Sequence, residues 1–240
     1  MPLQLKGAKL TWLGHATFLI ENAGKAILID PWVQNNPMCP EKNKKLPRID
    51  LMLITHGHFD HIADAVEIAK QQQPMVIGIA ELCHWLGRKG VQNLAEMNKG
   101  GTQRLKEMGV DVTMVHADHS CGIKDGDEMV YGGEACGYVL SFHSGLKLYH
   151  SGDTNVFGDM KIIRELYAPE IALLPIGDHY TMGPREVAHA CGLLRPKQVV
   201  PMHFGTFPPL VGRTGDLRER FKGSSIESEI VEMKPGETLE

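Results

Sequence analysis

Short apolar runs alternate with longer amphipathic stretches along the chain, and this pattern predicts an α/β protein. The short runs are rich in branched aliphatic residues, which favours strands at 9–13, 16–21, 25–29, 51–55, 76–80, 110–115, 137–142, 146–149, 171–176 and 199–202. Apolar residues three or four positions apart instead predict helices at 61–72, 81–88, 159–167 and 184–194. The tail from Ile226 alternates between apolar and polar residues, and we expect it to add an edge strand.

Turn signals separate these elements. The Asn-Ala-Gly segment 22–24 predicts the tight turn of a hairpin, and Asp30 followed by Pro31 ends the third strand. Residues 34–48 contain three prolines and many polar residues, which predicts a surface loop. The strand at 51–55 is almost continuously apolar, as expected for a strand buried on both faces. Strands interspersed with helices predict a layered α/β sandwich.

Composition narrows the class of protein. With 240 residues, 42% hydrophobic and 22% charged, the chain is typical of one globular domain. We expect a single domain, 1–240, built from two similar halves at about 1–115 and 116–240, each leading from strands to a polar loop and a helix. A net charge of −4 gives no electrostatic reason to expect nucleic-acid binding.

The expected location is the cytoplasm. No apolar run approaches the ~20 residues of a membrane helix, and the N-terminal residues lack the apolar core of a secretion signal. Five scattered cysteines, an odd number without a C-x-x-C pair, indicate a reducing compartment and no disulfide framework. The oligomeric state stays open, with a homo-oligomer as one alternative.

The segment 55–61 carries the clearest chemical signal. His56, His58, Asp60 and His61 place four metal-competent side chains within six residues, directly after a buried strand. This spacing fits neither one strand face nor one helix face, so it requires a tight loop, for which Gly57 offers backbone freedom. Imidazoles with a carboxylate suit zinc or another first-row metal. The alternative, a capping Asp60 beside surface histidines, does not explain why all four follow an apolar strand.

The T-H-x-H-x-D-H pattern of residues 55–61 resembles the signature of the metallo-β-lactamase superfamily. This resemblance implies a four-layer αββα sandwich and two divalent metal ions. It also implies three further ligands, which match His119, Asp153 and His203; the nearby His116 still belongs to the strand and is expected to pack there. One metal would be held by His56, His58 and His119, and the other by Asp60, His61 and His203, with Asp153 between them.

Two further motifs narrow the resemblance. The Trp-Leu-Gly-His-Ala-Thr segment 12–17 resembles the opening of the branch that contains ascorbate-6-phosphate lactonase and the phospholipase D acting on N-acyl-phosphatidylethanolamine. Residues 174–178 and 180–184, Leu-Pro-Ile-Gly-Asp and Tyr-Thr-Met-Gly-Pro, resemble a group of uncharacterised bacterial and archaeal metal-dependent hydrolases within that branch.

Four other residues are candidates for a role around the site. Asp30 resembles the aspartate of the superfamily's first motif, which steadies the ligand loop by hydrogen bonds, although ordinary turn chemistry explains it equally well. His15 could reach the site or stay solvated in a turn. Asp178 and His179 lie where a strand ends in a loop, so they could face substrate, donate a proton to a leaving group, or do neither.

The resemblance implies hydrolysis. Two divalent ions, most readily Zn²⁺ with Mn²⁺ or Fe²⁺ as alternatives, would lower the pKa of a bridging water to ~7, and Asp60 would act as a catalytic residue that orients the resulting hydroxide. The expected substrate is a small molecule with an ester-like bond, namely a carboxylic ester, a lactone or a phosphodiester, in a pocket shaped by loops 34–48 and 178–183. A non-catalytic metal-binding or interaction protein, and an RNA or DNA phosphodiesterase, remain the alternatives.

Overall fold

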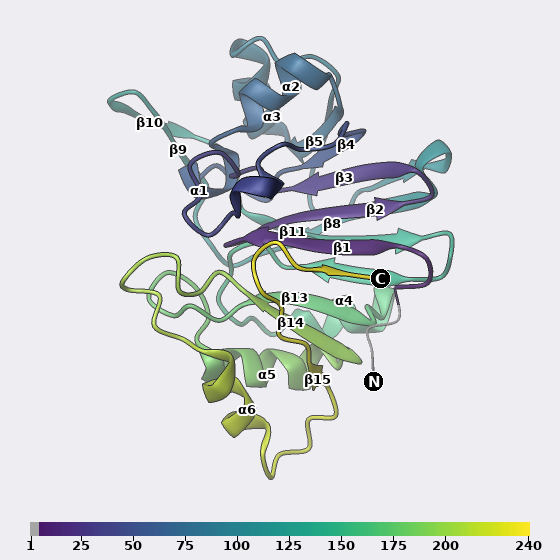
Figure 1. Ribbon diagram of the computed structural model, residues 1–240, viewed down its shortest axis with the longest axis vertical. Helices are drawn as coiled ribbons and strands as arrows, with labels where there is room; N and C mark the ends of the chain where they lie inside the picture. Colours follow the sequence, from purple (N-terminus) through teal and green to yellow (C-terminus); the bar gives the residue numbers. More distant parts are fainter. Residues whose placement is uncertain (1–4) are drawn as a thin grey trace.

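Two mixed β-sheets lie face to face at the centre of the molecule, and helices cover their outer faces (Figure 1). This computed structural model describes residues 5–240. The first sheet has the strand order β16 (Thr238–Leu239), β1 (Lys9–Gly14), β2 (Thr17–Asn22), β3 (Lys25–Ile29), β4 (Leu51–Leu53), β5 (Met75–Ile79) and β6 (Leu94–Met97). The second has the order β15 (Glu229–Ile230), β14 (Gln198–Met202), β13 (Ile171–Pro175), β12 (Lys147–His150), β11 (Cys136–Phe142), β8 (Val110–His116) and β7 (Thr102–Leu105).

Each sheet changes from antiparallel to parallel pairing part-way across. In the first sheet β1, β2 and β3 pair antiparallel, whereas β3 to β6 run parallel. In the second sheet β7, β8, β11 and β12 pair antiparallel, whereas β12 to β15 run parallel. The carboxyl ends of parallel strands meet at one edge of a sheet, which is where ligand sites form in α/β folds.

The helices lie in two separate outer layers. They are α1 (Phe59–Ile62), α2 (Ala65–Gln72), α3 (Ala80–Arg88), α4 (Met160–Tyr167), α5 (Pro184–Leu194) and α6 (Thr214–Phe221), with short 3₁₀ turns η1 (Glu41–Asn43) and η2 (Lys106–Met108). Figure 1 shows α2 and α3 beyond β4 and β5, and α5 and α6 at the opposite end beyond β13 and β14. The layer order is therefore helices, sheet, sheet, helices, as the resemblance implied.

Two hydrophobic cores match these layers. The larger contains inward-facing residues of both sheets, such as Leu10 and Met52 of the first and Met114 and Leu140 of the second, together with apolar residues of α2 and α3. The smaller lies between the second sheet and helices α4 to α6 and includes Tyr149. A small separate hairpin, β9 (Gly122–Asp125) with β10 (Glu128–Tyr131), projects from the body of the molecule (Figure 1).

All ten predicted strands are present, and three of the four predicted helices form as single elements. The helix predicted at 61–72 is divided into α1 and α2. The division falls at Asp64, whose carboxylate accepts hydrogen bonds from the backbone N–H groups of Val33 (2.5 Å) and Gln34 (2.9 Å). Asp64 itself donates its backbone N–H to Pro31 O at 3.0 Å, so these contacts fix the loop after β3 and interrupt the helix.

The C-terminal tail contributes to both sheets, where one edge strand was predicted. β15 pairs with β14, and β16 pairs with β1 of the other sheet. Strands β6, β7, β9 and β10 and helix α6 lack a clear apolar period in the sequence and were not predicted. The division of the chain into two equivalent halves stays a prediction.

All five cysteines are buried and free, as expected from their number and spacing. Among residues 5–240, no helix combines the length and the apolar character needed to cross a membrane.

Candidate metal centre

The predicted ligands lie just after the carboxyl ends of four strands, one in the first sheet and three in the second. His56 and His58 follow β4, Asp60 and His61 belong to α1, His119 follows β8, Asp153 follows β12, and His203 follows β14. The structure brings all seven of these side chains together from four separate segments of the chain. A tertiary arrangement of this kind is required because no local element could align them.

Three imidazoles form the first group of donors. Nε2 of His56 lies 2.9 Å from Nδ1 of His58, and Nε2 of His119 lies 3.3 Å from that same Nδ1. All three donor atoms lie within 4.8 Å of one another, the arrangement expected of side chains that share one cation. His56 is buried, whereas His58 and His119 are half-buried, so this group is open to solvent on one side.

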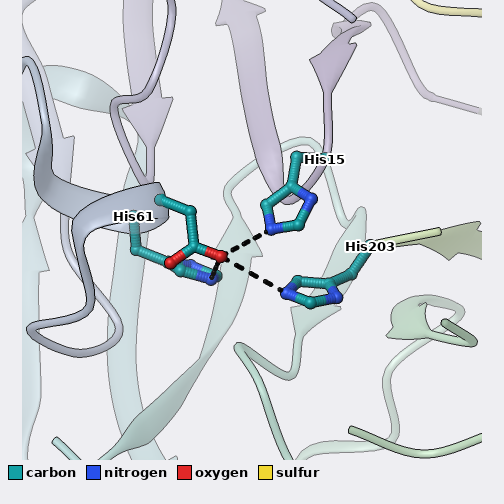
Figure 2. Close-up of side chains that lie close together, drawn as sticks. His15, His61 and His203 are labelled. Carbon is teal, nitrogen blue, oxygen red and sulfur yellow. Dashed lines mark hydrogen bonds and ion pairs between the residues drawn. The ribbon is translucent and has the colours of Figure 1, made fainter. Parts of the chain in front are cut away.

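The second group is buried and contains one residue more than predicted. Asp60, His61 and His203 are joined by His15, again with donor atoms within 4.8 Å of one another. Oδ2 of Asp60 lies 2.9 Å from Nε2 of His15, 3.8 Å from Nε2 of His203 and 3.9 Å from Nε2 of His61. Figure 2 shows the three labelled imidazoles directed toward this common point.

Asp153 lies between the two groups. Its Oδ2 is 3.0 Å from Nε2 of His203 and 3.3 Å from Nε2 of His61, which belong to the second group. The same oxygen is 3.7 Å from Nε2 of His119 and 3.9 Å from Nε2 of His56, which belong to the first. One carboxylate therefore contacts donors of both groups, so it could bridge two cations.

Buried polar atoms without hydrogen-bond partners gather in this centre. They are Nε2 of His61, both ring nitrogens of His203 and Oδ1 of Asp153. A buried polar group without a partner typically destabilises a protein by about 1–3 kcal/mol, and native structures rarely retain several in one place unless an ion or water satisfies them. The donor set of imidazole and carboxylate fits a divalent first-row metal.

The charge state of the histidines supports the same fit. Burial, with a smaller repulsion from neighbouring histidines, lowers the pKa of His56, His58 and His119, so their imidazoles are neutral with lone pairs available for a cation. Burial also opposes ionisation of His203, but the Asp153 carboxylate outweighs it and raises the pKa of His203 to about 9. A region that attracts a proton to a buried imidazole attracts a metal ion for the same electrostatic reason.

Both carboxylates of the centre are ionised. Burial alone would raise the pKa of Asp60, yet the hydrogen bond with His15 and the proximity of the His203 and His61 imidazoles more than offset it and hold that pKa well below its usual range. The pKa of Asp153 is likewise lowered, because His203 and His61 outweigh the effect of burial. Two negative charges thus stand among the imidazoles of the centre.

Asp30 holds His61 from behind. Its Oδ2 lies 2.7 Å from Nδ1 of His61, and its two oxygens accept hydrogen bonds from the backbone N–H and the hydroxyl of Thr55, each at 2.8 Å. The Thr55 hydroxyl also lies 3.0 Å from Nδ1 of His56. Asp30 and Thr55 therefore orient donors of both groups, leaving Nε2 of each imidazole to face the centre. Sequence reasoning did not single out Thr55, although it opens the T-H-x-H-x-D-H pattern.

His15 is completely buried rather than solvated in a turn. Its Nδ1 lies 2.9 Å from the hydroxyl of Thr206, and its ring packs against the tilted ring of His203 with centroids 3.8 Å apart. The backbone of His15, Asp30 and His203 has φ of 56°, 50° and 56°. Left-handed backbone costs about 1–3 kcal/mol for such residues and is typical of functional sites, where surrounding contacts enforce it.

Asp178 and His179 lie outside both donor groups. Both are exposed in the loop after β13, where Oδ1 of Asp178 accepts the backbone N–H of His179 at 2.7 Å and the His179 ring contacts Tyr180. The loop is attached beside the centre, because Met182 donates its backbone N–H to Thr154 O at 3.1 Å. Loop 34–48 reaches the same region, since Sδ of Met38 accepts a hydrogen bond from the Thr206 hydroxyl.

Gly57, His116 and His150 make structural contacts and do not belong to the donor groups. Gly57 does not adopt a left-handed backbone; it is required because a Cβ there would lie 2.4 Å from Cγ1 of Ile123 in β9. His116 is exposed and packs its ring on Phe157, 4.8 Å between centroids, so it lies apart from the donor groups as expected. His150 is buried with its Nε2 3.0 Å from Ala16 O, which gives it a structural partner.

Comparison with known proteins agrees with the fold and the site. The profile of the beta-lactamase superfamily domain matches residues 25–204, from β3 to the residue after His203. The chain belongs to this superfamily. The matched residues 25–204 contain all seven candidate ligands. Its fold is the four-layer metallo-β-lactamase sandwich, in agreement with the prediction from the resemblance.

Full-length relatives carry the name UPF0173 metal-dependent hydrolase. The chain is 60% identical to such a protein from Koribacter versatilis, over 98% of this chain and 99% of the relative. It is 54% identical to one from Solibacter usitatus, over 97% of this chain and 99% of the relative. A solved novel metallo hydrolase from the archaeon Ignicoccus hospitalis is 37% identical, with a TM-score of 0.85 and 97% of each chain covered. A solved isothiocyanate hydrolase from Delia radicum gut bacteria is 25% identical, with a TM-score of 0.75 and coverage of 97% and 98%.

Proposed function

We propose that this chain is a metal-dependent hydrolase that holds two divalent metal ions and cleaves an ester-like bond in a small molecule. The observation that carries the proposal is the pair of adjacent donor groups connected by Asp153, with several buried polar atoms of these residues lacking a hydrogen-bond partner. The names of its full-length relatives support the hydrolase class. Zinc is the metal that this donor set favours, and manganese or iron(II) are compatible with it.

Each candidate ligand has an assigned place in the proposal. His56, His58 and His119 hold one ion; Asp60, His61 and His203 hold the other; and Asp153 contacts both. When bound, such a pair of ions supplies an activated water as nucleophile and a positive charge that stabilises the developing oxyanion.

The protein's own residues set the geometry of the reaction. Asp60 is ionised and carries the hydrogen bond from His15 on Oδ2, so its carboxylate is oriented to accept a hydrogen bond from the attacking water and to position it. Asp30 and Thr55 prevent the imidazoles of His61 and His56 from rotating. The half-buried side formed by His58 and His119 is where substrate enters, because the donors of the second group are buried.

The first test measures metal and turnover in the same protein. Elemental analysis of the metal-replete chain should give about two divalent ions per chain, and a panel of carboxylic esters, lactones and phosphodiesters should contain a substrate. Isothiocyanates belong in the panel because one solved relative is an isothiocyanate hydrolase. A chain that binds two ions but is inert toward the whole panel would favour a metal-binding protein without catalysis.

The second test concerns the catalytic role of Asp60. Asp60→Ala should reduce kcat on the substrate found by at least about 100-fold, the usual size of a positioned acid–base contribution. Asp111→Ala, the same substitution at a half-exposed carboxylate of β8 that pairs with His143, is the matched control and should keep full activity. Unchanged turnover in Asp60→Ala would contradict the mechanism.

A further inference from the structure

Three aromatic side chains gather beside the candidate metal centre. Trp32 follows β3, Phe59 is the first residue of α1, and Phe207 lies in the loop after β14. Their ring centroids are 5.7 Å apart for Trp32 and Phe59, 5.7 Å for Trp32 and Phe207, and 6.2 Å for Phe59 and Phe207. We call these three residues the aromatic cluster. Each ring contacts the other two, so the cluster presents one continuous apolar surface.

The aromatic cluster borders the second donor group directly. The His15 ring lies 5.2 Å from Trp32 and 5.6 Å from Phe207, and the same imidazole is 2.9 Å from Oδ2 of Asp60. Phe59 is the residue between His58 and Asp60 in the sequence, so its backbone is part of the ligand loop. A molecule positioned for attack at the centre would therefore extend across these rings.

The cluster has a buried base and an open face. Trp32 is only 4% exposed and Phe207 is half-buried, whereas Phe59 is 58% exposed. Covering an exposed apolar surface is favourable by about 25 cal/mol for each Å² removed from water. A large exposed ring next to converging polar groups is typical of a ligand site, in which the ligand covers the ring.

Backbone hydrogen bonds hold two of the three rings in place before any ligand binds. The loop of Phe207 is closed by bonds from Gly205 N to Leu210 O (3.1 Å) and from Leu210 N to Phe207 O (3.0 Å). The carbonyl of Trp32 accepts hydrogen bonds from Asn36 Nδ2 (3.0 Å) and from the Thr17 hydroxyl (3.2 Å). A rigid surface binds a flat ligand with little loss of conformational entropy.

The polar surroundings of the centre favour an uncharged group on this surface. Within residues 5–240, the side chains that hydrogen-bond or pair with the side chains of the seven candidate ligands are those of His, Asp, Thr and Ser. Neither an arginine nor a lysine takes part, although these are the residues that recognise phosphate and carboxylate groups by charge. The contacts of the ligand side chains therefore include no cation that would bind such a group.

We infer that the aromatic cluster binds an aryl group of the substrate, so that the substrates are aryl esters or aryl-substituted lactones rather than short aliphatic or phosphate-rich molecules. This inference rests on the proposed function, since it names the substrate class of the same site. The aryl ring covers the open face of Phe59 while the scissile carbonyl reaches the region between Asp60 and Asp153.

The test uses binding of inert ligands, so it does not depend on turnover. Isothermal titration of the metal-replete chain compares 4-phenylbutyrate with butyrate, which have the same carboxylate and linker and differ by the ring. We expect phenylbutyrate to bind about tenfold more tightly to the wild-type chain, from ring burial and aromatic contact. In Phe59→Ala the preference should fall to within about twofold, and Phe59→Leu should give an intermediate value.

Leu166→Ala is the matched control. Leu166 is 66% exposed near the end of α4, a comparably open apolar side chain on a helix that carries none of the candidate ligands, and its removal should leave the tenfold preference intact. Sedimentation velocity of the wild-type chain and Phe59→Ala shows whether a second copy of the chain covers the ring instead.

Three results would overturn the inference. The first is that phenylbutyrate binds the wild-type chain no more tightly than butyrate, or that neither binds. The others are that Phe59→Ala keeps the preference for phenylbutyrate, or that this substitution changes the sedimentation coefficient. Failure of the proposed function is distinguishable from each. A chain that prefers phenylbutyrate but hydrolyses no ester contradicts the hydrolase proposal alone, whereas a chain that hydrolyses esters without regard to the ring contradicts the aryl inference alone.

Discussion

Nε2 of His15 lies 2.9 Å from Oδ2 of Asp60, across 45 positions of sequence, and both side chains are buried. The contact joins the turn after β1 to helix α1 and orients the carboxylate toward His61 and His203. Because Thr206 fixes the opposite ring nitrogen of His15 at 2.9 Å, the imidazole has one orientation. This relationship makes His15 a positioning residue for Asp60.

His15→Ala should lower kcat about 10- to 100-fold while KM changes little, because substitution of an outer partner of a ligand typically has an effect of this size. The metal content after dialysis, measured on the same sample, should fall toward one ion per chain. His143→Ala, which removes an imidazole that pairs only with the half-exposed Asp111, should behave like the wild type. A variant with full activity and two ions would show that His15 only packs.

Asp30→Ala should weaken binding of the metal held by His61. The substitution removes the acceptor of three hydrogen bonds, from Thr55 N, the Thr55 hydroxyl and the His61 ring. We expect a loss of metal affinity of about 10- to 100-fold, measured by competition with a chromophoric chelator. Equal affinity in the variant and the wild-type chain would mean that the ordinary role of Asp30 is to end β3.

Gly57→Ala should destabilise the chain by about 1–3 kcal/mol, the usual cost of overpacking a buried position. The new Cβ would lie 2.4 Å from Cγ1 of Ile123, so one of the two segments must move. Ile123→Ala should recover part of this loss when combined with Gly57→Ala, although it is destabilising by itself. A double-mutant cycle from urea unfolding measures the coupling, and strictly additive effects would contradict the steric explanation.

The metal-free chain should be most stable near pH 6.5. Burial, with repulsion from His203, lowers the pKa of His15 to about 4, so the unfolded chain binds more protons than the folded one between pH 6.5 and 4, and stability falls as the pH decreases through this range. His203 acts in the opposite direction: its pKa of about 9 is above the unfolded value, so its contribution is complete below pH 6.5 and is lost as the pH rises through 9.

Urea unfolding of the chelator-treated chain at pH 4.5, 6.5 and 9 measures this dependence. His15→Gln should reduce the difference between pH 6.5 and pH 4.5, while its stability should still decline between pH 6.5 and pH 9. A free energy of unfolding that increases steadily from pH 6.5 to pH 9 would contradict the assignment of His203.

Much of the fold is legible in the sequence because its strands are short, strongly apolar and separated by clear turn signals. The strand that became β4 is an example, since its continuous apolar run predicts burial on both faces, and Leu51, Met52 and Leu53 are completely buried. The weaker elements were missed for the opposite reason. β6 and β7 have mixed burial and little periodicity, so their pairing with β5 and β8 stabilises them more than their own residues do.

The break between α1 and α2 could not be predicted from local pattern. The apolar spacing of residues 61–72 favours one helix, but Asp64 uses its carboxylate to bind the backbone of Val33 and Gln34, which are about thirty positions away. A long-range contact thus competed with a local preference and prevailed.

The sequence by itself determined the chemical inventory of this protein: the four donors at His56, His58, Asp60 and His61, the positions of ten strands along the chain, and the resemblance that supplied His119, Asp153 and His203. Only the tertiary structure decided that His15 is buried against Asp60, that Asp178 and His179 lie outside the donor groups, and that three rings form one surface beside the centre. The reason is physical. Spacing along a chain constrains neighbours within one element, whereas contacts between distant strand ends depend on the packing of the two sheets, which no local pattern encodes.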